Sequence, residues 1–208
     1  MSSVLIRISA LLMWLALAAC TSLQPVAPFG NTDFQANEQA LRAYPNWALT
    51  GRLNVKQSQK SDTVNINWQQ QQQRFEIRLW GMIGLGATRV YGGDHGVTVE
   101  KAGEKPEQLP NLEALTKDYL NFEFPAAYLL YWVRALPVPG IAATTEFDAS
   151  SRLSSLSQRD NRGRLWQLTF ERYVQVQDVV LPRRIKLATG DLQLTFLIDQ
   201  WQLNAATP

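Results

Sequence analysis

The sequence predicts a mainly β protein with a few helices, in which an antiparallel meander of short strands curls into a barrel or half-barrel. Two observations support this fold class. Apolar and polar residues alternate with a period of two in many short segments, and tight turn signals separate these segments. The length of 208 residues further indicates one domain that can bury a substantial core.

The first twenty residues have the layout of a bacterial export signal. One charged residue, Arg7, precedes an apolar run over residues 8–17, and small residues follow it. The apolar run is about half as long as the ~20 residues that a membrane-spanning helix needs. We therefore expect residues 1–19 to be a signal peptide that is removed on export.

Cys20 is the only cysteine in the sequence, so no intramolecular disulfide can form even in an oxidising compartment. The sequence Leu17-Ala18-Ala19-Cys20 resembles the lipobox of bacterial lipoproteins, whose cysteine is acylated. We expect lipidation at Cys20 rather than an inert buried thiol, and several acyl chains together would anchor the protein almost irreversibly. Thr21 follows where Asp favours inner-membrane retention in such lipoproteins, so this resemblance implies the outer membrane.

The segment after the signal peptide is expected to be a tether. Residues 20–32 include two prolines, a glycine and several small residues, a composition that favours a flexible chain over a packed fold. Residues 33–208 form the single folded domain of this prediction.

Three segments of this domain predict helices. Residues 33–44 carry good helix formers, and a proline follows them. Apolar residues recur at helical spacing over 112–119, with Asn111 as a candidate N-cap. The third segment, 125–134, is apolar nearly all round, so we expect this helix to be buried on more than one side and to plug the mouth of the curled sheet.

Alternation predicts the strands. A run of five glutamines, residues 69–73, is interpreted as a polar, solvated turn between the two strands of a hairpin. The apolar face of this hairpin consists of Val64, Ile66 and Trp68 in its first strand and of Phe75, Ile77 and Leu79 in its second. Further strands are expected at 88–91, 97–99, 153–157, 166–170, 185–187 and 192–198, with turn signals at 92–94, 161–163 and 190–191.

The composition argues against several function classes. Without Arg7 the 20 basic residues become 19 against 18 acidic ones, and a nearly neutral surface does not favour nucleic-acid binding. One histidine, His95, and one cysteine cannot supply a zinc or iron site, and His95 is expected to be a solvent-facing turn residue. No nucleophile elbow or phosphate loop occurs. We expect no enzyme, metal or cofactor, although the scattered acidic residues leave a paired-carboxylate hydrolase open.

A glycine-rich apolar loop is predicted between two strands at residues 81–86. Its residues Met82, Ile83 and Leu85 are unfavourable to expose to water. The loop therefore either tucks into the core or forms a tip that contacts a membrane or a lipidated client. The residues alone leave both alternatives open.

Several short motifs follow one another along nearly the whole mature chain. They are Trp47, Thr50-Gly51-Arg52-Leu53, Trp68-Gln69, the loop at 79–86, Tyr131-Trp132-Val133-Arg134, Leu136-Pro137-Val138-Pro139, Leu181-Pro182 and Ile198-Asp199-Gln200-Trp201. Their order, together with the lipobox, resembles the LolB family of outer-membrane lipoprotein receptors. In that family the loop has a Gly-Pro-Leu-Gly-like turn. Its protruding leucine falls on Ile83 and its proline on Met82, which keeps the apolar character but loses the rigidity of proline.

The resemblance implies an unclosed antiparallel β-barrel of about eleven strands, with helices covering a hydrophobic cavity. It also implies an activity without a cofactor, in which the protein accepts lipoproteins from the periplasmic carrier LolA and releases them into the outer membrane. We expect a monomer that faces the periplasm and is held at the inner leaflet of the outer membrane by its lipid. Met82, Ile83 and Leu85 would form the membrane-insertion loop. The residues expected to line the acyl-chain cavity are Val64, Ile66, Trp68, Phe75, Ile77, Leu79, Tyr128, Leu129 and Trp132.

Other interpretations remain open. The same apolar residues would equally form an ordinary core. The chain could then be a structural or assembly lipoprotein that binds protein partners without holding lipid. A third class is a lipid carrier or lipid-modifying enzyme of the envelope. Extraction of bound lipid followed by mass spectrometry separates the lipid-binding receptor from the structural lipoprotein, and turnover assays test for the enzyme.

Overall fold

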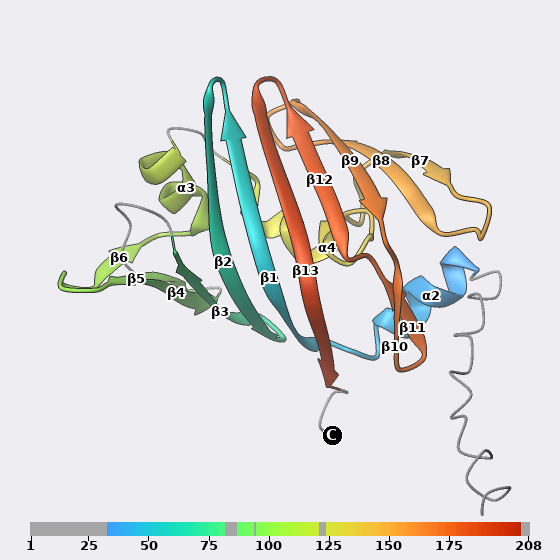
Figure 1. The fold of residues 1–208 in the computed structure, drawn as a ribbon, viewed down its shortest axis with the longest axis horizontal. Coiled ribbons are helices and arrows are strands. Elements are labelled where there is room, and N and C mark those ends of the chain that lie inside the picture. Colours follow the sequence, from blue (N-terminus) through green and yellow to red (C-terminus); the bar gives the residue numbers. More distant parts are fainter. Residues whose placement is uncertain (1–32, 82–86, 94, 121–123, 205–208) are drawn as a thin grey trace, which may run out of the picture. The chain divides into compact units, whose positions relative to one another are not determined.

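The computed structural model describes residues 33–81, 87–93, 95–120 and 124–204, which fall in one compact unit. Its main feature is an eleven-stranded antiparallel sheet in the order β6-β5-β4-β3-β2-β1-β13-β12-β9-β8-β7 (Figure 1). The strands are β1 (Asn46–Gln57), β2 (Lys60–Gln71), β3 (Arg74–Trp80), β4 (Thr88–Gly93), β5 (Gly96–Lys101), β6 (Glu107–Leu109), β7 (Ala143–Phe147), β8 (Leu153–Arg159), β9 (Leu165–Glu171), β12 (Arg184–Thr189) and β13 (Leu192–Asn204). A separate hairpin pairs β10 (Val174–Val176) with β11 (Val179–Leu181).

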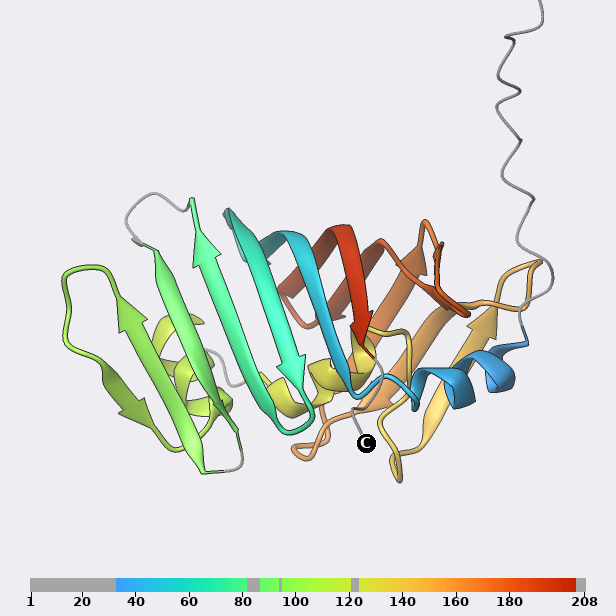
Figure 2. The same ribbon diagram turned by 90° about the horizontal axis from the view of Figure 1, so that it is seen from below.

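The predicted fold class is confirmed. The protein is mainly β, and because β6 and β7 are the two edges of the sheet and do not pair with each other, the curved sheet is not closed. Figure 2 shows the sheet bending around the helices that lie against one of its faces. We call this the inner face.

The period of two decides which side chains face inward. Along β2 the buried residues are every second one, and the intervening residues are half-buried or exposed. The strand β1 pairs with β2 on one side and with β13 on the other, so it stands at the centre of the sheet. A bulge between Thr50 and Gly51 shifts the register with β13. A Cβ added at Gly51 would lie 2.1 Å from the carbonyl oxygen of Leu197, so the close approach of β1 and β13 at this bulge requires glycine.

The first two predicted helices are present. Helix α2 (Phe34–Leu41) begins behind Asp33, whose carboxylate accepts a hydrogen bond from the Gln35 N–H at 2.9 Å. Helix α3 (Leu112–Leu120) begins behind Asn111, whose side-chain oxygen accepts from the Ala114 N–H at 2.9 Å. In the described part of the chain, no helix has the length and apolar character needed to cross a membrane.

The third predicted helix is shorter and less regular than expected. It consists of a 3-10 turn, η2 (Ala126–Tyr128), and one α-helical turn, α4 (Leu129–Trp132). The Leu136 N–H bonds back to the Tyr131 carbonyl at 3.1 Å, and Ala135 adopts a positive φ of 57°, which ends the helix. The prediction of burial holds for Ala126, Trp132 and Val133, whereas the side chains at 128–131 are half-buried.

The glutamine run is not a turn over its whole length. Only Gln72 and Gln73 form the turn, and Gln69 to Gln71 extend β2. Gln70 is buried on the inner face, where its Oε1 accepts from the Trp68 indole at 3.2 Å and its Nε2 donates to the Gln72 carbonyl at 2.7 Å. A local hydrogen-bond partner for each end of the amide lets this polar side chain occupy an inward position.

Four short strands were not predicted. They are β6, β7, β10 and β11, none longer than five residues. Each is too short for alternation to stand out from the neighbouring loops. Two of them, β6 and β7, matter because they are the edges that leave the sheet open.

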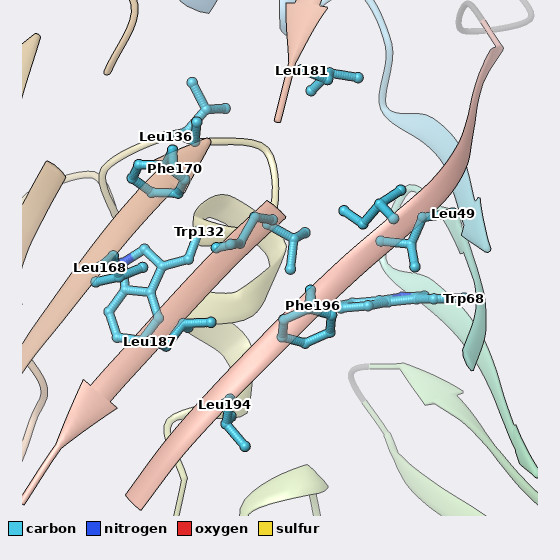
Figure 3. Packing of buried hydrophobic residues seen from close by; sticks show 14 of the residues in the cluster. Leu49, Trp68, Trp132, Leu136, Leu168, Phe170, Leu181, Leu187, Leu194 and Phe196 are labelled. Atoms are coloured by element: carbon cyan, nitrogen blue, oxygen red, sulfur yellow. The ribbon is translucent and has the colours of Figure 1, made fainter. Parts of the chain in front are cut away.

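The core lies between the inner face of the sheet and the η2–α4 segment. Figure 3 shows the Trp132 indole projecting from α4 toward Leu168 of β9 and Leu187 of β12. All three side chains are at most 1 % exposed. The chain segment of η2 and α4 thus covers the inner face and shares one continuous core with it.

Candidate functional site

The candidate site is an apolar pocket of about 180 Å³ between the inner face of the sheet and the two helical segments that cover it. Strands β2, β3, β4 and β5 supply one wall, while α3, η2 and α4 supply the other. Its lining residues are Trp68, Gln70, Gln73, Phe75, Gly93, Val97, Asn111, Leu112, Glu113, Ala126, Ala127 and Leu130. Apolar side chains from both walls face this space, which suits a hydrocarbon ligand.

A larger hollow of about 940 Å³ lies on the opposite, outer face of the sheet. Ten of its fifteen lining residues are Asn or Gln, and the neighbouring strands β1, β2 and β13 supply most of them. Hydrocarbon chains gain nothing from a wall of amides, since these would lose hydration without a hydrogen-bond partner. We therefore assign the site to the smaller pocket under the helices.

The segment of η2 and α4, which we call the cover, is fixed to the sheet at the C-terminal end of α4. The indole Nε1 of Trp132 donates to Gln158 Oε1 at 3.0 Å, and the Val138 N–H donates to the same oxygen at 2.9 Å. The Nε2 of Gln158 donates to the carbonyl oxygens of Val138 and Ile141 at 3.2 and 3.1 Å. Gln158 is 1 % exposed and belongs to β8. One buried amide thus ties the end of the cover to the strand beneath it.

Aromatic packing holds both ends of the cover, because Phe124 precedes η2 and Trp132 ends α4. The Trp166 ring of β9 lies 5.6 Å from the Trp132 ring and 4.8 Å from the Phe124 ring, measured between centroids. The Trp166 indole donates to Asp160 Oδ2 at 3.1 Å, and Arg164 Nε donates to that oxygen at 2.7 Å. Burial raises the pKa of the Asp160 carboxyl, but the hydrogen bonds from Trp166 and Arg164 and from two backbone N–H groups outweigh it, so this pKa lies below its usual value.

At the other end of the cover, Phe124 and Ala126 are buried in the core, and two backbone N–H groups bond to side chains of α3. The Ala127 N–H of η2 donates to Glu113 Oε1 of α3 at a long 3.4 Å. The Phe124 N–H donates to Thr116 Oγ1 at 3.1 Å. The pocket lies beside these residues, between η2 and the start of α3.

The nine residues predicted for the cavity occupy both walls. Val64, Ile66, Trp68 and Trp132 are buried in the core, whereas the others are half-buried and pack against it. The half-buried residues are Phe75, Ile77, Leu79, Tyr128 and Leu129. Of the nine, Trp68 and Phe75 line the pocket. The acyl-binding role of the set stays a prediction.

Sequence reasoning missed most of the pocket lining. Val97, Leu112 and Leu130 lie in elements that were recognised, but the sequence pattern does not say which of their apolar residues face a space rather than a neighbour. Gln70 was assigned to a solvated turn. The continuation of alternation through Trp68 to residue 70 was the available signal for its inward position.

The remaining predicted sites lie outside the described residues. This applies to Cys20 and to Met82, Ile83 and Leu85. The nearest described residue before the loop with a large side chain is Trp80 at the end of β3, which is 43 % exposed. His95 is exposed in the turn between β4 and β5, as predicted. Within the described ranges, no group of three or more potential metal-ligating side chains comes together.

Comparison with known proteins agrees with this architecture. A family model described as "Outer membrane lipoprotein LolB" matches residues 45–201. The outer-membrane lipoprotein LolB of Stutzerimonas stutzeri is 35 % identical over 192 residues, which cover 90 % of this chain and 91 % of the relative. That of Pseudomonas aeruginosa is 33 % identical over 195 residues, 93 % of each chain. A LolA superfamily protein from Nitrosomonas europaea shares the fold, with a TM-score of 0.51 at 7 % identity over 82 % of this chain and 94 % of that chain. The chain therefore belongs to the LolB family of outer-membrane lipoproteins.

Proposed function

We propose that this outer-membrane lipoprotein is a receptor that accepts acylated lipoproteins from the periplasmic carrier LolA and inserts them into the outer membrane. The observation that supports this proposal most directly is the apolar pocket between the inner face of the sheet and the helical cover. Acyl chains cannot cross water unshielded, and a wall of apolar side chains would shield them in transit.

The size of the pocket indicates that its helical wall moves when a client binds. Its volume of about 180 Å³ is below the roughly 300–1,000 Å³ that is usual for small-molecule sites. We expect α3 to shift away from β2 and β5, because the two hydrogen bonds described between α3 and the η2 segment, from the Phe124 and Ala127 N–H groups, are its described side-chain ties to the cover. The end of the cover near Trp132 would stay in place, since Gln158 holds it.

Transfer requires no cofactor in this scheme. A client moves downhill if the receptor binds its acyl chains more tightly than the carrier does and the bilayer holds them more tightly still. Each step is then driven by how much more completely the next site buries the same methylene groups, and full burial from water is worth about 0.8 kcal/mol for each.

Membrane attachment completes the proposal. Residues 1–19 would be removed, and Cys20 would carry the acyl chains. Residues 20–32 would then tether the monomeric domain to the inner leaflet of the outer membrane. Met82, Ile83 and Leu85 would enter the bilayer during release. The exposed indole of Trp80, immediately before this loop, supports a membrane-facing position, because tryptophan is favoured at the membrane–water interface.

The test separates acceptance of a client from its delivery. The acyl-free chain from Thr21 onward, carrying Ile83→Glu, is loaded with a lipidated client from the carrier and mixed with liposomes. We expect near-normal folding and acceptance but impaired delivery, because a carboxylate is unfavourable in the acyl region. Leu165→Glu is the matched control, since Leu165 is also an exposed apolar residue, at 42 %.

Three outcomes contradict parts of the proposal. Normal delivery by a folded Ile83→Glu protein removes the insertion role of the loop. Unfolding of this variant alone means that Ile83 is part of the core. Absence of any bound client in the wild-type protein contradicts the receptor function and favours a structural lipoprotein instead.

A further inference from the structure

Arg134 is a half-buried cation without an acidic partner. It follows α4 and packs against the core, with its guanidinium carbon 5.7 Å from the centre of the buried Trp47 ring. Its Nε donates to the Leu130 carbonyl at 3.0 Å. Among the described residues, neither of its two terminal nitrogens has a hydrogen-bond acceptor, and no carboxylate forms an ion pair with it.

This arrangement is unusual for an arginine on an apolar surface. Burial lowers the pKa of the Arg134 guanidinium below its usual value, because the charged form is poorly solvated there. The interaction with the Trp47 ring offsets part of this cost. Other core-side arginines of the protein do have carboxylates, as Arg152 has Asp148 at 2.7 Å and Arg164 has Asp160 at 2.7 Å. Arg134 differs from these arginines in that its described contacts are a ring and a backbone carbonyl, without a carboxylate.

The position of Arg134 relates it to the pocket. Leu130, whose carbonyl orients the guanidinium, lines the pocket. Trp68 lines it too, and the Trp68 ring lies 5.0 Å from the Trp47 ring under Arg134. Arg134 does not itself line the pocket, but the Leu130 carbonyl and the packed rings of Trp47 and Trp68 connect it to residues that do.

We propose that Arg134 binds the oxygen-bearing end of an acyl ligand whose hydrocarbon chain lies in the pocket. This inference rests on the proposed acyl-binding function and adds a polar determinant to it. The terminal nitrogens supply N–H donors, and either a carboxylate or an ester carbonyl supplies the acceptor. The cation that has no partner in the free protein gains one when the ligand enters.

The experiment compares ligands that share one chain and differ in their polar end. The acyl-free chain from Thr21 onward is loaded with the uncharged apolar fluorophore N-phenyl-1-naphthylamine. This fluorophore is then displaced by dodecanoate, which has a carboxylate, or by methyl dodecanoate, which has an ester. The variants are Arg134→Leu, Arg134→Lys and, as a matched control, Arg52→Leu, which removes an exposed arginine from the outer face of β1.

We expect Arg134→Leu to weaken dodecanoate binding by about ten- to hundredfold, the range for losing a hydrogen bond to a charged group. Methyl dodecanoate should lose less affinity, because its carbonyl is uncharged. Affinity for the fluorophore should stay within about twofold. Arg134→Lys should recover part of the loss, and Arg52→Leu should behave as wild type. The Tm of Arg134→Leu should be unchanged or higher, since an apolar residue replaces a cation without a carboxylate.

Two results overturn the inference. One is dodecanoate affinity in Arg134→Leu within twofold of wild type. The other is an equal loss for the fluorophore and both ligands together with a lower Tm, which would make Arg134 a structural residue. If the wild-type protein binds neither the fluorophore nor either ligand, the proposed acyl-binding function fails as well.

Discussion

Replacement of Gln158 by methionine is expected to destabilise the protein strongly, because this amide joins the helical cover to the sheet. Methionine has a similar length but no hydrogen-bonding amide. The Trp132 indole N–H, which is fully buried, then loses its acceptor. The backbone groups of Val138 and Ile141 lose their contacts with the same side chain.

The magnitude follows from which of these groups can reach water. A buried donor without an acceptor costs about 1–3 kcal/mol, and this applies to Trp132. Val138 and Ile141 are half-buried and regain water in part, so their lost bonds cost up to about 1 kcal/mol each. We therefore expect Gln158→Met to lower the free energy of unfolding by about 3 kcal/mol. For a domain of this size, the Tm should fall by roughly 6–12 °C.

Urea denaturation followed by tryptophan fluorescence measures this change directly. The matched control is Gln167→Met on the neighbouring strand β9, where the side chain is exposed on the outer face. The control should stay within about 0.5 kcal/mol of wild type, because surface substitutions have small effects. A loss below 1 kcal/mol for Gln158→Met, or equal losses for both variants, would refute the role of this amide.

Three further predictions concern other parts of the chain. Because the folded pKa of Asp160 lies below its ordinary value, the stability that this carboxylate contributes is present above about pH 4 and is lost as the pH falls below that. Asp160→Asn should lower the free energy of unfolding by about 3 kcal/mol at pH 7 and flatten its acid dependence, measured as unfolding curves at a series of pH values. An unchanged acid dependence would contradict this prediction. Gly51→Ala should lower the free energy of unfolding by about 3 kcal/mol, because the new Cβ meets the Leu197 carbonyl, and a loss below 1 kcal/mol in urea melts would show that the bulge adapts. Cys20→Ala should abolish metabolic labelling with a fatty acid, whereas equal labelling of wild type and variant would remove the lipobox assignment.

Much of the fold could be predicted from the local pattern of residues. The alternation in β2 identified Val64, Ile66 and Trp68 as inward-facing, because successive side chains of a strand point to opposite faces. The Asn111 cap and the start of α3 were predictable for a similar reason, since a capping residue bonds to a backbone group three residues away. The fold class also followed, because the turns between strands are short.

The pocket could be located only with the tertiary structure. It forms where Trp68 and Phe75 of one hairpin meet Leu112 and Leu130, which lie more than thirty residues further along the chain. A period of two tells which side of a strand is apolar, but not whether a helix covers that side closely or leaves a space. Gln70 is a different case: it was assigned to solvent because glutamine is usually exposed, although its place two residues after Trp68 puts it on the inward face.

The sequence by itself determined the mainly β fold class and the inward faces of β2 and β3, because both depend on neighbours within a few residues. It also supplied the segment that resembles a lipobox and the order of motifs that indicated the family. The tertiary structure confirmed the open sheet that the family resemblance implied, and it alone showed that β6 and β7 are the edges, because strands this short leave no readable alternation. It likewise showed that, among the described residues, no carboxylate forms an ion pair with Arg134, because a charge finds its partner through folding and not through its place in the chain.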